Sequence, residues 1–151
     1  MKQFDHMDDR GKISMIDTTG KPAALKEAEA SGFIHLKPET IRMIKENELE
    51  KGEIITMAEI AGMQAAKNTS NLVPLVHQVS LSGVEVKAYV YPNGIEVKSV
   101  IRSVGHTGLE TEALAAVSIA LLTLFEICKN VDGAPVISDI KLTRKIQETE
   151  S

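Results

Sequence analysis

The sequence predicts a single α+β domain in which helices cover one face of a mainly antiparallel sheet. Residues 107–132 form a long apolar stretch whose charges are confined to its two ends, which is typical of a buried helix. Residues 84–98 alternate apolar and polar side chains on either side of Asn93-Gly94, a strong β-hairpin signal. The third observation is a strand-like run at residues 136–142, after the long helix.

The first predicted elements precede the hairpin. The polar residues 1–12 are expected to be flexible, and residues 17–24 are rich in turn-forming residue types. Residues 26–31, KEAEAS, have helical propensity, but their alternation also suits a strand. Pro38 opens a short helix that reaches about Glu46, because proline is favoured in a first helical turn.

A second helix is expected over residues 55–67, where apolar side chains recur at helical spacing. The small residues that would let this helix pack closely against a neighbour are Ala61, Gly62, Ala65 and Ala66. The polar stretch before it, residues 46–53, is expected to be a loop that carries Lys51 and Gly52.

Two details concern the ends of the later elements. The alternation in the second strand of the hairpin slips at Val100-Ile101, which predicts a bulge or the end of strand pairing. Thr107 and Glu110 fit a capping box at the start of the long helix, with Thr107 as the N-cap residue. Helices and strands in this order favour a ferredoxin-like sandwich.

Composition limits the possible functions. The net charge of −4 and the scarcity of aromatic residues argue against nucleic-acid partners and against attraction to anionic membranes. The single cysteine, Cys128, excludes an intramolecular disulfide and suits a reducing cytoplasm. No signal peptide is recognisable, and the apolar part of the long helix, residues 113–125, is too short to cross a bilayer. We therefore expect a cytoplasmic protein.

Glu126 and Lys129 are the charged pair near the end of the long helix. They are three residues apart, so both side chains lie on one face of the helix. Spacing alone favours a surface ion pair worth about 0.2–0.5 kcal/mol. The alternative is an acid–base carboxylate beside a cation that holds its charge or binds an anionic substrate.

Histidines and glycines carry weaker signals. His77 follows an apolar run, and a histidine in such a position is more often a half-buried structural residue than a ligand. The other histidines, His6, His35 and His106, form no cluster with each other or with Cys128, so no zinc site is expected. No glycine-rich phosphate loop is present, so lysine side chains would have to bind any phosphate group.

Two long blocks, residues 51–77 and 107–132, closely resemble the MoaC family of molybdenum-cofactor biosynthesis, the cyclic pyranopterin monophosphate synthases. The segment MIDTTGKPAALKEAEASGFIHL is similar to the same family, so the resemblance covers nearly all of residues 1–151, in order. It implies a single ferredoxin-like domain. It also implies a hexamer, built as a trimer of dimers, with the site at a subunit interface.

The reaction that the resemblance implies converts (8S)-3′,8-cyclo-7,8-dihydroguanosine 5′-triphosphate into cyclic pyranopterin monophosphate and releases pyrophosphate. This is acid–base chemistry on a GTP-derived small molecule. It implies no redox cofactor and no metal site in the protein, and it is compatible with a divalent cation on the triphosphate. A non-catalytic ferredoxin-like oligomer that binds an anionic metabolite would share the fold and the lysines but would not need Glu126.

The motifs of the family fall on particular residues of this chain. Its catalytic aspartate, in a DMCK motif, falls on Glu126, and its active-site lysines fall on Lys51 and Lys129. The implied substrate-binding positions are Leu75, Val76, His77, Glu110, Thr111, Glu112, Lys67, Lys26 and Lys145. By their chemistry, Glu126 would transfer protons, the lysines would face the triphosphate, and His77 would be a hydrogen-bond or proton partner.

This chain departs from the family pattern at several positions. Glu126 is one methylene longer than aspartate, so either the pocket is adjusted or the activity is weakened. Val76 and Thr111 stand where the family has cysteine and methionine, and Lys26 replaces an arginine, which removes bidentate phosphate geometry. The GGKSG tail of the family is absent, so closure over a substrate would have to come from another segment.

The length of the helix constrains the site. Fourteen residues separate Glu112 from Glu126, which places them about 21 Å apart along one straight helix. A nucleotide-sized ligand cannot readily bring both into its reacting shell. We therefore expect the Glu126 and Lys129 end of one chain to meet the His77 and Glu112 region of a neighbouring chain.

Overall fold

The computed structural model describes residues 4–17, 19–20, 23–105 and 107–149. Its strands are β1 (Ala24–His35), β2 (Gly83–Tyr91), β3 (Gly94–Gly105) and β4 (Val136–Thr149). Its helices are α1 (Pro38–Glu46), α2 (Glu48–Lys67), α3 (Thr69–Leu72) and α4 (Glu110–Asp132). Of the segments discussed above, residues 1–3, residues 18, 21 and 22, and His106 lie outside the described residues.

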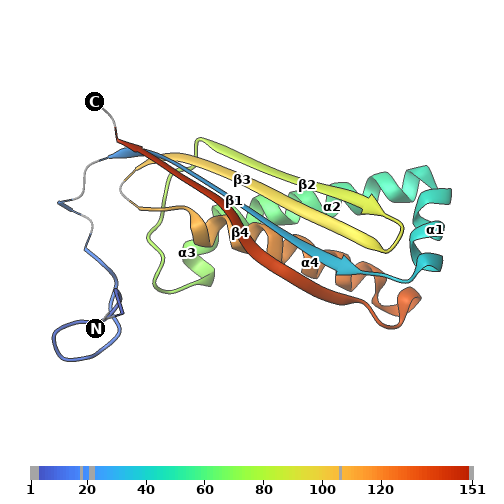
Figure 1. Ribbon diagram of the computed structural model, residues 1–151, viewed down its shortest axis with the longest axis horizontal. Coiled ribbons are helices and arrows are strands. Elements are labelled where there is room, and N and C mark those ends of the chain that lie inside the picture. The colour runs from blue at the N-terminus through green and yellow to red at the C-terminus, as the bar shows by residue number, and fades with distance from the viewer. Residues whose placement is uncertain (1–3, 18, 21–22, 106, 150–151) are drawn as a thin grey trace.

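The sheet has four strands in the order β2-β3-β1-β4, and every neighbouring pair is antiparallel. The two long helices, α2 and α4, lie against the same face of this sheet (Figure 1). This strand order and layering confirm the predicted ferredoxin-like α+β sandwich. The predicted short helix from Pro38 to Glu46 and the hairpin at Asn93-Gly94 are confirmed as well.

The ambiguous residues 26–31 belong to strand β1, which is central and pairs with both β3 and β4. The alternation decided between strand and helix, because Ala28 and Ala30 are buried on the side of the helices. Gly32 continues this inner face. A Cβ there would lie 2.6 Å from Leu121 Cδ1, so only glycine lets α4 lie this close to β1.

The bulge or end of pairing predicted at Val100-Ile101 is wrong. Strand β3 pairs without interruption with β1 as far as Gly105. The apparent slip came from Ser99, a polar residue on the inner face that is buried and donates a hydrogen bond of 2.8 Å to the carbonyl oxygen of Ala113. A small hydroxyl side chain is suited to this close contact with α4.

The loop predicted at residues 46–53 is also wrong, because α2 begins at Glu48. The Asn47 side chain accepts a hydrogen bond of 3.2 Å from the backbone N–H of Glu50 and caps the helix. Helix capping by asparagine thus outweighed the polar composition, and Lys51 lies in the first turns of α2 rather than in a loop.

Helix α4 begins and ends differently from its prediction. Its N-cap residue is Leu109 and no side chain caps it, so the capping box with Thr107 as N-cap is wrong. At its other end Asp132 is buried and accepts hydrogen bonds from the Lys37 backbone N–H, at 2.7 Å, and from Thr40 Oγ1, at 2.6 Å. These bonds join the end of α4 to the start of α1.

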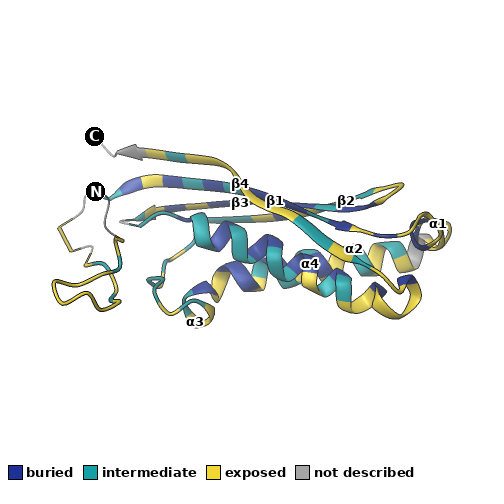
Figure 2. Cartoon of the chain, turned by 60° about the horizontal axis from the view of Figure 1, so that its bottom comes forward, coloured by how far each residue is buried: buried dark blue, intermediate teal, exposed yellow. Residues whose placement is uncertain are grey.

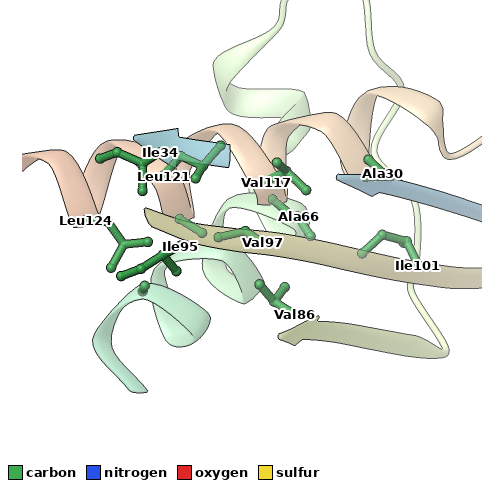
Figure 3. Packing of buried hydrophobic residues seen from close by; sticks show 14 of the residues in the cluster. Ala30, Ile34, Ala66, Val86, Ile95, Val97, Ile101, Val117, Leu121 and Leu124 are labelled. Atoms are coloured by element: carbon green, nitrogen blue, oxygen red, sulfur yellow. The ribbon is translucent and has the colours of Figure 1, made fainter. Parts of the chain in front are cut away.

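The core lies between the sheet and the two long helices, and most of its largest side chains come from β1, β3 and α4 (Figure 3). Helix α4 is long and apolar enough to cross a membrane by length and composition, a test that the core helix of a soluble protein also passes. Val117, Leu121 and Leu124 are fully buried in this core. Burial is complete only on this side of the helix (Figure 2).

The opposite side of the helix layer is apolar and exposed in the single chain. Leu122 of α4 is 53% exposed, and Met57 and Ile60 of α2 are 56% and 43% exposed. We call these three residues the outer helix face. A patch of this kind is typical of a surface that another protein chain covers.

Gly62 is expected to be intolerant of a side chain, because α2 and α4 cross there. A Cβ at Gly62 would lie 2.8 Å from the carbonyl oxygen of Ala116 and 2.9 Å from Val86 Cγ1. We expect Gly62→Ala to lower the free energy of unfolding by about 1–3 kcal/mol in urea denaturation. Gly52→Ala is the matched control in the same helix, since a Cβ there meets nothing within 4 Å. It should leave stability unchanged or raise it, and equal effects of the two substitutions would contradict the close crossing.

Candidate active site

A cleft of about 570 Å³ lies where α4 begins and β4 ends, at the opposite end of the molecule from α1 (Figure 1). Its volume is in the range of small-molecule sites. The sequence-predicted residues that line it are Lys26, Leu75, Val76, His77, Glu110, Thr111, Glu112 and Lys145. Four segments that are distant in sequence therefore meet in one cleft. Lys67, the last residue of α2, is exposed and is not part of its lining.

The sheet supplies the basic side of the cleft. Lys26 pairs with Gln147 across the strands β1 and β4, and Ala28 pairs with Lys145. Directly paired residues share one face of a sheet, and Ala28 faces the helices, so Lys26, Lys145 and Gln147 do so as well. Lys26 is only 7% exposed, which makes it a cation held within the protein and not a solvated surface lysine.

Glu110, the first residue of α4, pairs with Lys145 across the cleft. The distance between Glu110 Oε1 and Lys145 Nζ is 2.6 Å. Burial acts to raise the pKa of Glu110, but the hydrogen bond from Lys145 and the charges of Lys145 and Lys26 outweigh it and lower the pKa below its usual value. A Cβ at Gly108 would collide with this carboxylate, so glycine gives Glu110 room to fold back. Glu110 is thus a fixed anion of the cleft.

Glu112 is the second carboxylate, and its environment shifts its pKa in the opposite direction from that of Glu110. It is 3% exposed, and burial raises its pKa, with a further contribution from the negative charge of Glu110. Two neighbouring carboxyl groups whose pKa values are displaced in opposite directions are suited to different roles in proton transfer and binding. Glu112 is the one that takes up a proton more readily.

The loop after α3 brings Leu75, Val76 and His77 to the cleft, and all three are half-buried. Thr69 anchors this short helix through hydrogen bonds from its buried hydroxyl to the carbonyl oxygens of Ala65 and Ala66. The half-buried position expected of a structural histidine is therefore compatible with a place in the cleft.

Glu126, Lys129 and Lys51 lie elsewhere. Helices α2 and α4 run in opposite directions, so the first turns of α2 and the last turns of α4 share the end of the molecule that is remote from the cleft (Figure 1). Glu126 and Lys129 form an ion pair of 2.9 Å, with side-chain exposures of 70% and 41%. Within one chain this is the surface ion pair that spacing alone favoured. None of these three residues lines the cleft.

Several lining residues of the cleft were not predicted from the sequence. They are Asp5, His6, Ile16, Thr107, Gly108 and Gln147. The strand register would have identified Gln147, because it pairs with Lys26. No local pattern marks Asp5 or His6, whose positions depend on how the N-terminal segment folds.

Among the described residues, no group of three or more His, Cys, Asp or Glu side chains could hold a metal ion. Cys128 is buried in the core, and burial raises the pKa of its thiol, which makes it a packing residue as expected.

The two carboxylates should have opposite effects on stability as pH changes. Because the pKa of Glu112 is raised by folding, its contribution to stability is lost as pH rises through the folded-state pKa. Glu112→Gln should therefore make the protein more stable than wild type at about pH 7.5. The difference in stability between variant and wild type should shrink as the pH falls to about 4. The free energy of unfolding, measured by urea denaturation across this range, checks it.

Glu110→Gln is the matched comparison. The pKa of Glu110 is lowered by folding, so its contribution is present at neutral pH and is lost as pH falls through the folded-state pKa. This variant should be less stable than wild type at neutral pH and should approach it in acid. Parallel pH profiles for the two variants would contradict the opposed environments.

Comparisons with known proteins agree with this geometry. Residues 15–147 of this chain match the sequence model of the MoaC family. A cyclic pyranopterin monophosphate synthase of Peptoclostridium acidaminophilum is 39% identical over 143 residues, which cover 95% of this chain and 91% of that protein. Cyclic pyranopterin monophosphate synthase 1 of Mycobacterium bovis is 43% identical over 141 residues, 93% of this chain and 83% of that protein.

A third relative is longer. It is the molybdenum cofactor biosynthesis bifunctional protein of Chlorobaculum tepidum, 43% identical over 143 residues, which are 95% of this chain but 46% of that protein. Together the family match and the full-length relatives decide the classification: the chain belongs to the MoaC family.

Proposed function

We propose that this chain is a cyclic pyranopterin monophosphate synthase, a lyase of molybdenum-cofactor biosynthesis. Its substrate would be (8S)-3′,8-cyclo-7,8-dihydroguanosine 5′-triphosphate, and its products cyclic pyranopterin monophosphate and pyrophosphate. The observation that carries this proposal is the cleft, where the fold gathers almost all the predicted substrate-binding residues from separate segments. The names of the relatives support the reaction.

The cleft at the start of α4 is suited to the guanine-derived part of the substrate. That part presents N–H and amino donors, and carboxylates are acceptors. Glu112 lines the cleft with a raised pKa, so it can accept such a hydrogen bond when ionised and takes up a proton more readily than an ordinary glutamate. His77 lines the same cleft as a second hydrogen-bond or proton partner.

The opposite end of α4 is suited to the triphosphate and to the second proton transfer. Lys51 and Lys129, whose pair with Glu126 is open to solvent, offer cations for phosphate oxygens. Glu126, beside Lys129, would be the acid–base group. The proposed reaction needs no redox cofactor, and any divalent cation would enter with the triphosphate.

The two ends must come from different chains to act on one molecule. Helix α4 is continuous from Glu110 to Asp132, so Glu112 and Glu126 are separated by about 21 Å of helix. We propose a homohexamer, a trimer of dimers, in which the Glu126 end of one chain completes the cleft of a neighbour. The exposed outer helix face supports association of this kind. The reduced, buried Cys128 suits a cytoplasmic location.

The first test supplies the cyclised GTP derivative and follows pyrophosphate and the pterin product. Glu126→Ala should lower kcat by about 10²–10⁴-fold, the range of a lost acid–base group. Glu126→Asp, which restores the side chain of the family, should keep activity. Glu39→Ala is the control, since Glu39 is an exposed helical carboxylate of α1. Undiminished turnover by Glu126→Ala would refute the assignment, and binding without turnover by wild type would favour the non-catalytic oligomer.

The second test asks whether two chains share one site. Chains with Glu126→Ala and chains with His77→Ala should each be inactive, whereas co-expression of both should restore activity. Random pairing predicts about one intact site in four. No restoration in mixed oligomers that mass spectrometry verifies would place both residues in a site of one chain and refute the shared site.

A further inference from the structure

The N-terminal segment of the described chain folds into a small closed loop. Met7 and Ile13 form a β-bridge, and Ser14 donates a backbone hydrogen bond of 2.8 Å to the carbonyl oxygen of His6. The Asp8 carboxylate accepts hydrogen bonds of 2.9 Å from the backbone N–H groups of Arg10 and Lys12. These bonds close the loop without help from the rest of the domain.

In this loop, large apolar side chains are exposed and a polar side chain is partly buried, the opposite of what the hydrophobic effect favours. Phe4 and Ile13 are 79% and 68% exposed, whereas the polar residue His6 is half-buried and lines the cleft with Asp5. Folding alone would favour the reverse arrangement. The orientation of the loop is therefore explained better by what its polar residues do in the cleft than by packing.

The hydrogen bond of His6 determines which ring nitrogen can serve the cleft. Nδ1 lies 3.1 Å from the carbonyl oxygen of Ser14. A carbonyl oxygen only accepts, so Nδ1 must carry the hydrogen. In the neutral ring Nε2 is then an acceptor, and the structure gives Nε2 no hydrogen-bond partner within the described parts of the chain.

The surroundings of His6 fit an acceptor of hydrogen bonds from a nucleoside. Across the cleft lie Glu110 and Glu112 from α4, His77 from the loop after α3, and Lys26 and Lys145 from the sheet, with Asp5 beside it. The acidic groups at least balance the basic ones, and Lys145 is already paired with Glu110. The cleft is thus suited to the donors of a ring and a ribose more than to a triphosphate.

We propose that His6 is a further substrate-binding residue, whose Nε2 accepts a hydrogen bond from an N–H or O–H group of the guanosine-derived part of the substrate. This inference rests on the proposed function and adds to it the N-terminal loop as a wall of the site.

Two amide substitutions separate contact with substrate from support of the loop. In His6→Asn the side-chain amide can still donate to the Ser14 carbonyl, but the position of Nε2 is lost. In His6→Gln the amide oxygen can reach the position of Nε2, but the bond to Ser14 is lost. We expect KM to rise about tenfold in His6→Asn and His6→Ala, as for one lost hydrogen bond, and less in His6→Gln. His35→Ala is the control, because His35 is exposed on strand β1 and does not line the cleft.

The outcomes distinguish this inference from the proposed function. If wild type makes no product, the proposed function fails. If wild type turns over and His6→Ala has the KM of wild type, the inference fails alone. If His6→Asn behaves as wild type while His6→Gln and His6→Ala are impaired, His6 only supports the loop and the inference is also overturned.

Nitrogen NMR on the intact protein gives a readout that does not depend on turnover. In protein labelled with ¹⁵N-histidine, the neutral His6 ring should carry its proton on Nδ1, and addition of the cyclised GTP derivative should shift the Nε2 resonance. His35 resonances should stay in place. A proton on Nε2 in the free protein, or no shift of His6 at saturating ligand, would overturn the inference.

Discussion

The close seating of α4 on the sheet is the constraint on which the rest of the molecule depends. It requires glycine at two points of contact, Gly32 beneath Leu121 and Gly62 beside the backbone of Ala116. Ser99 adds a hydrogen bond to the Ala113 carbonyl oxygen near the start of the helix. Because α4 is packed tightly against both β1 and α2, its first turn has a fixed position over β1 and β4. The cleft is a consequence of that position, because the carboxylates of the first turn then face the lysines of the two strands.

The same rigid helix separates the predicted site residues into two groups. At its start the carboxylates are partly or fully shielded, and their pKa values are displaced in opposite directions. At its end the Glu126–Lys129 pair is open to solvent, where an ion pair contributes little to stability. Within one chain, the Glu126 carboxylate is therefore still exposed to water. The buried Asp132, held by Lys37 and Thr40, fixes this end against α1. Both ends of α4 are therefore held in place, but only the carboxylates at its start are shielded from water within one chain.

The sequence was sufficient for the parts of the structure that local patterns determine. Alternation over the hairpin and the spacing of the long helix lead directly to the layers of the fold. The predictions were wrong where one polar residue has a tertiary role. Ser99 was interpreted as a break in strand pairing, but it bonds to α4. Glu110 was interpreted as part of a helix cap, but its partner is Lys145. The substrate-binding set followed from family resemblance and not from spacing, because the cleft joins segments that only the sheet register brings together. His6 could not be found in either way, since its place depends on the closure of a loop by backbone hydrogen bonds.

The outer helix face adjoins the proposed acid–base pair. Leu122 of this face is exposed one helical turn before Glu126, on the helix that also carries Lys129. A partner that covers this apolar surface would also remove water from around the ion pair, and electrostatic interactions become stronger as water is excluded. In the proposed hexamer, association and activation of Glu126 would then be one event, because the covered surface adjoins the charged pair. A soluble, isolated chain would have the binding half of the site without the environment that its acid–base half needs.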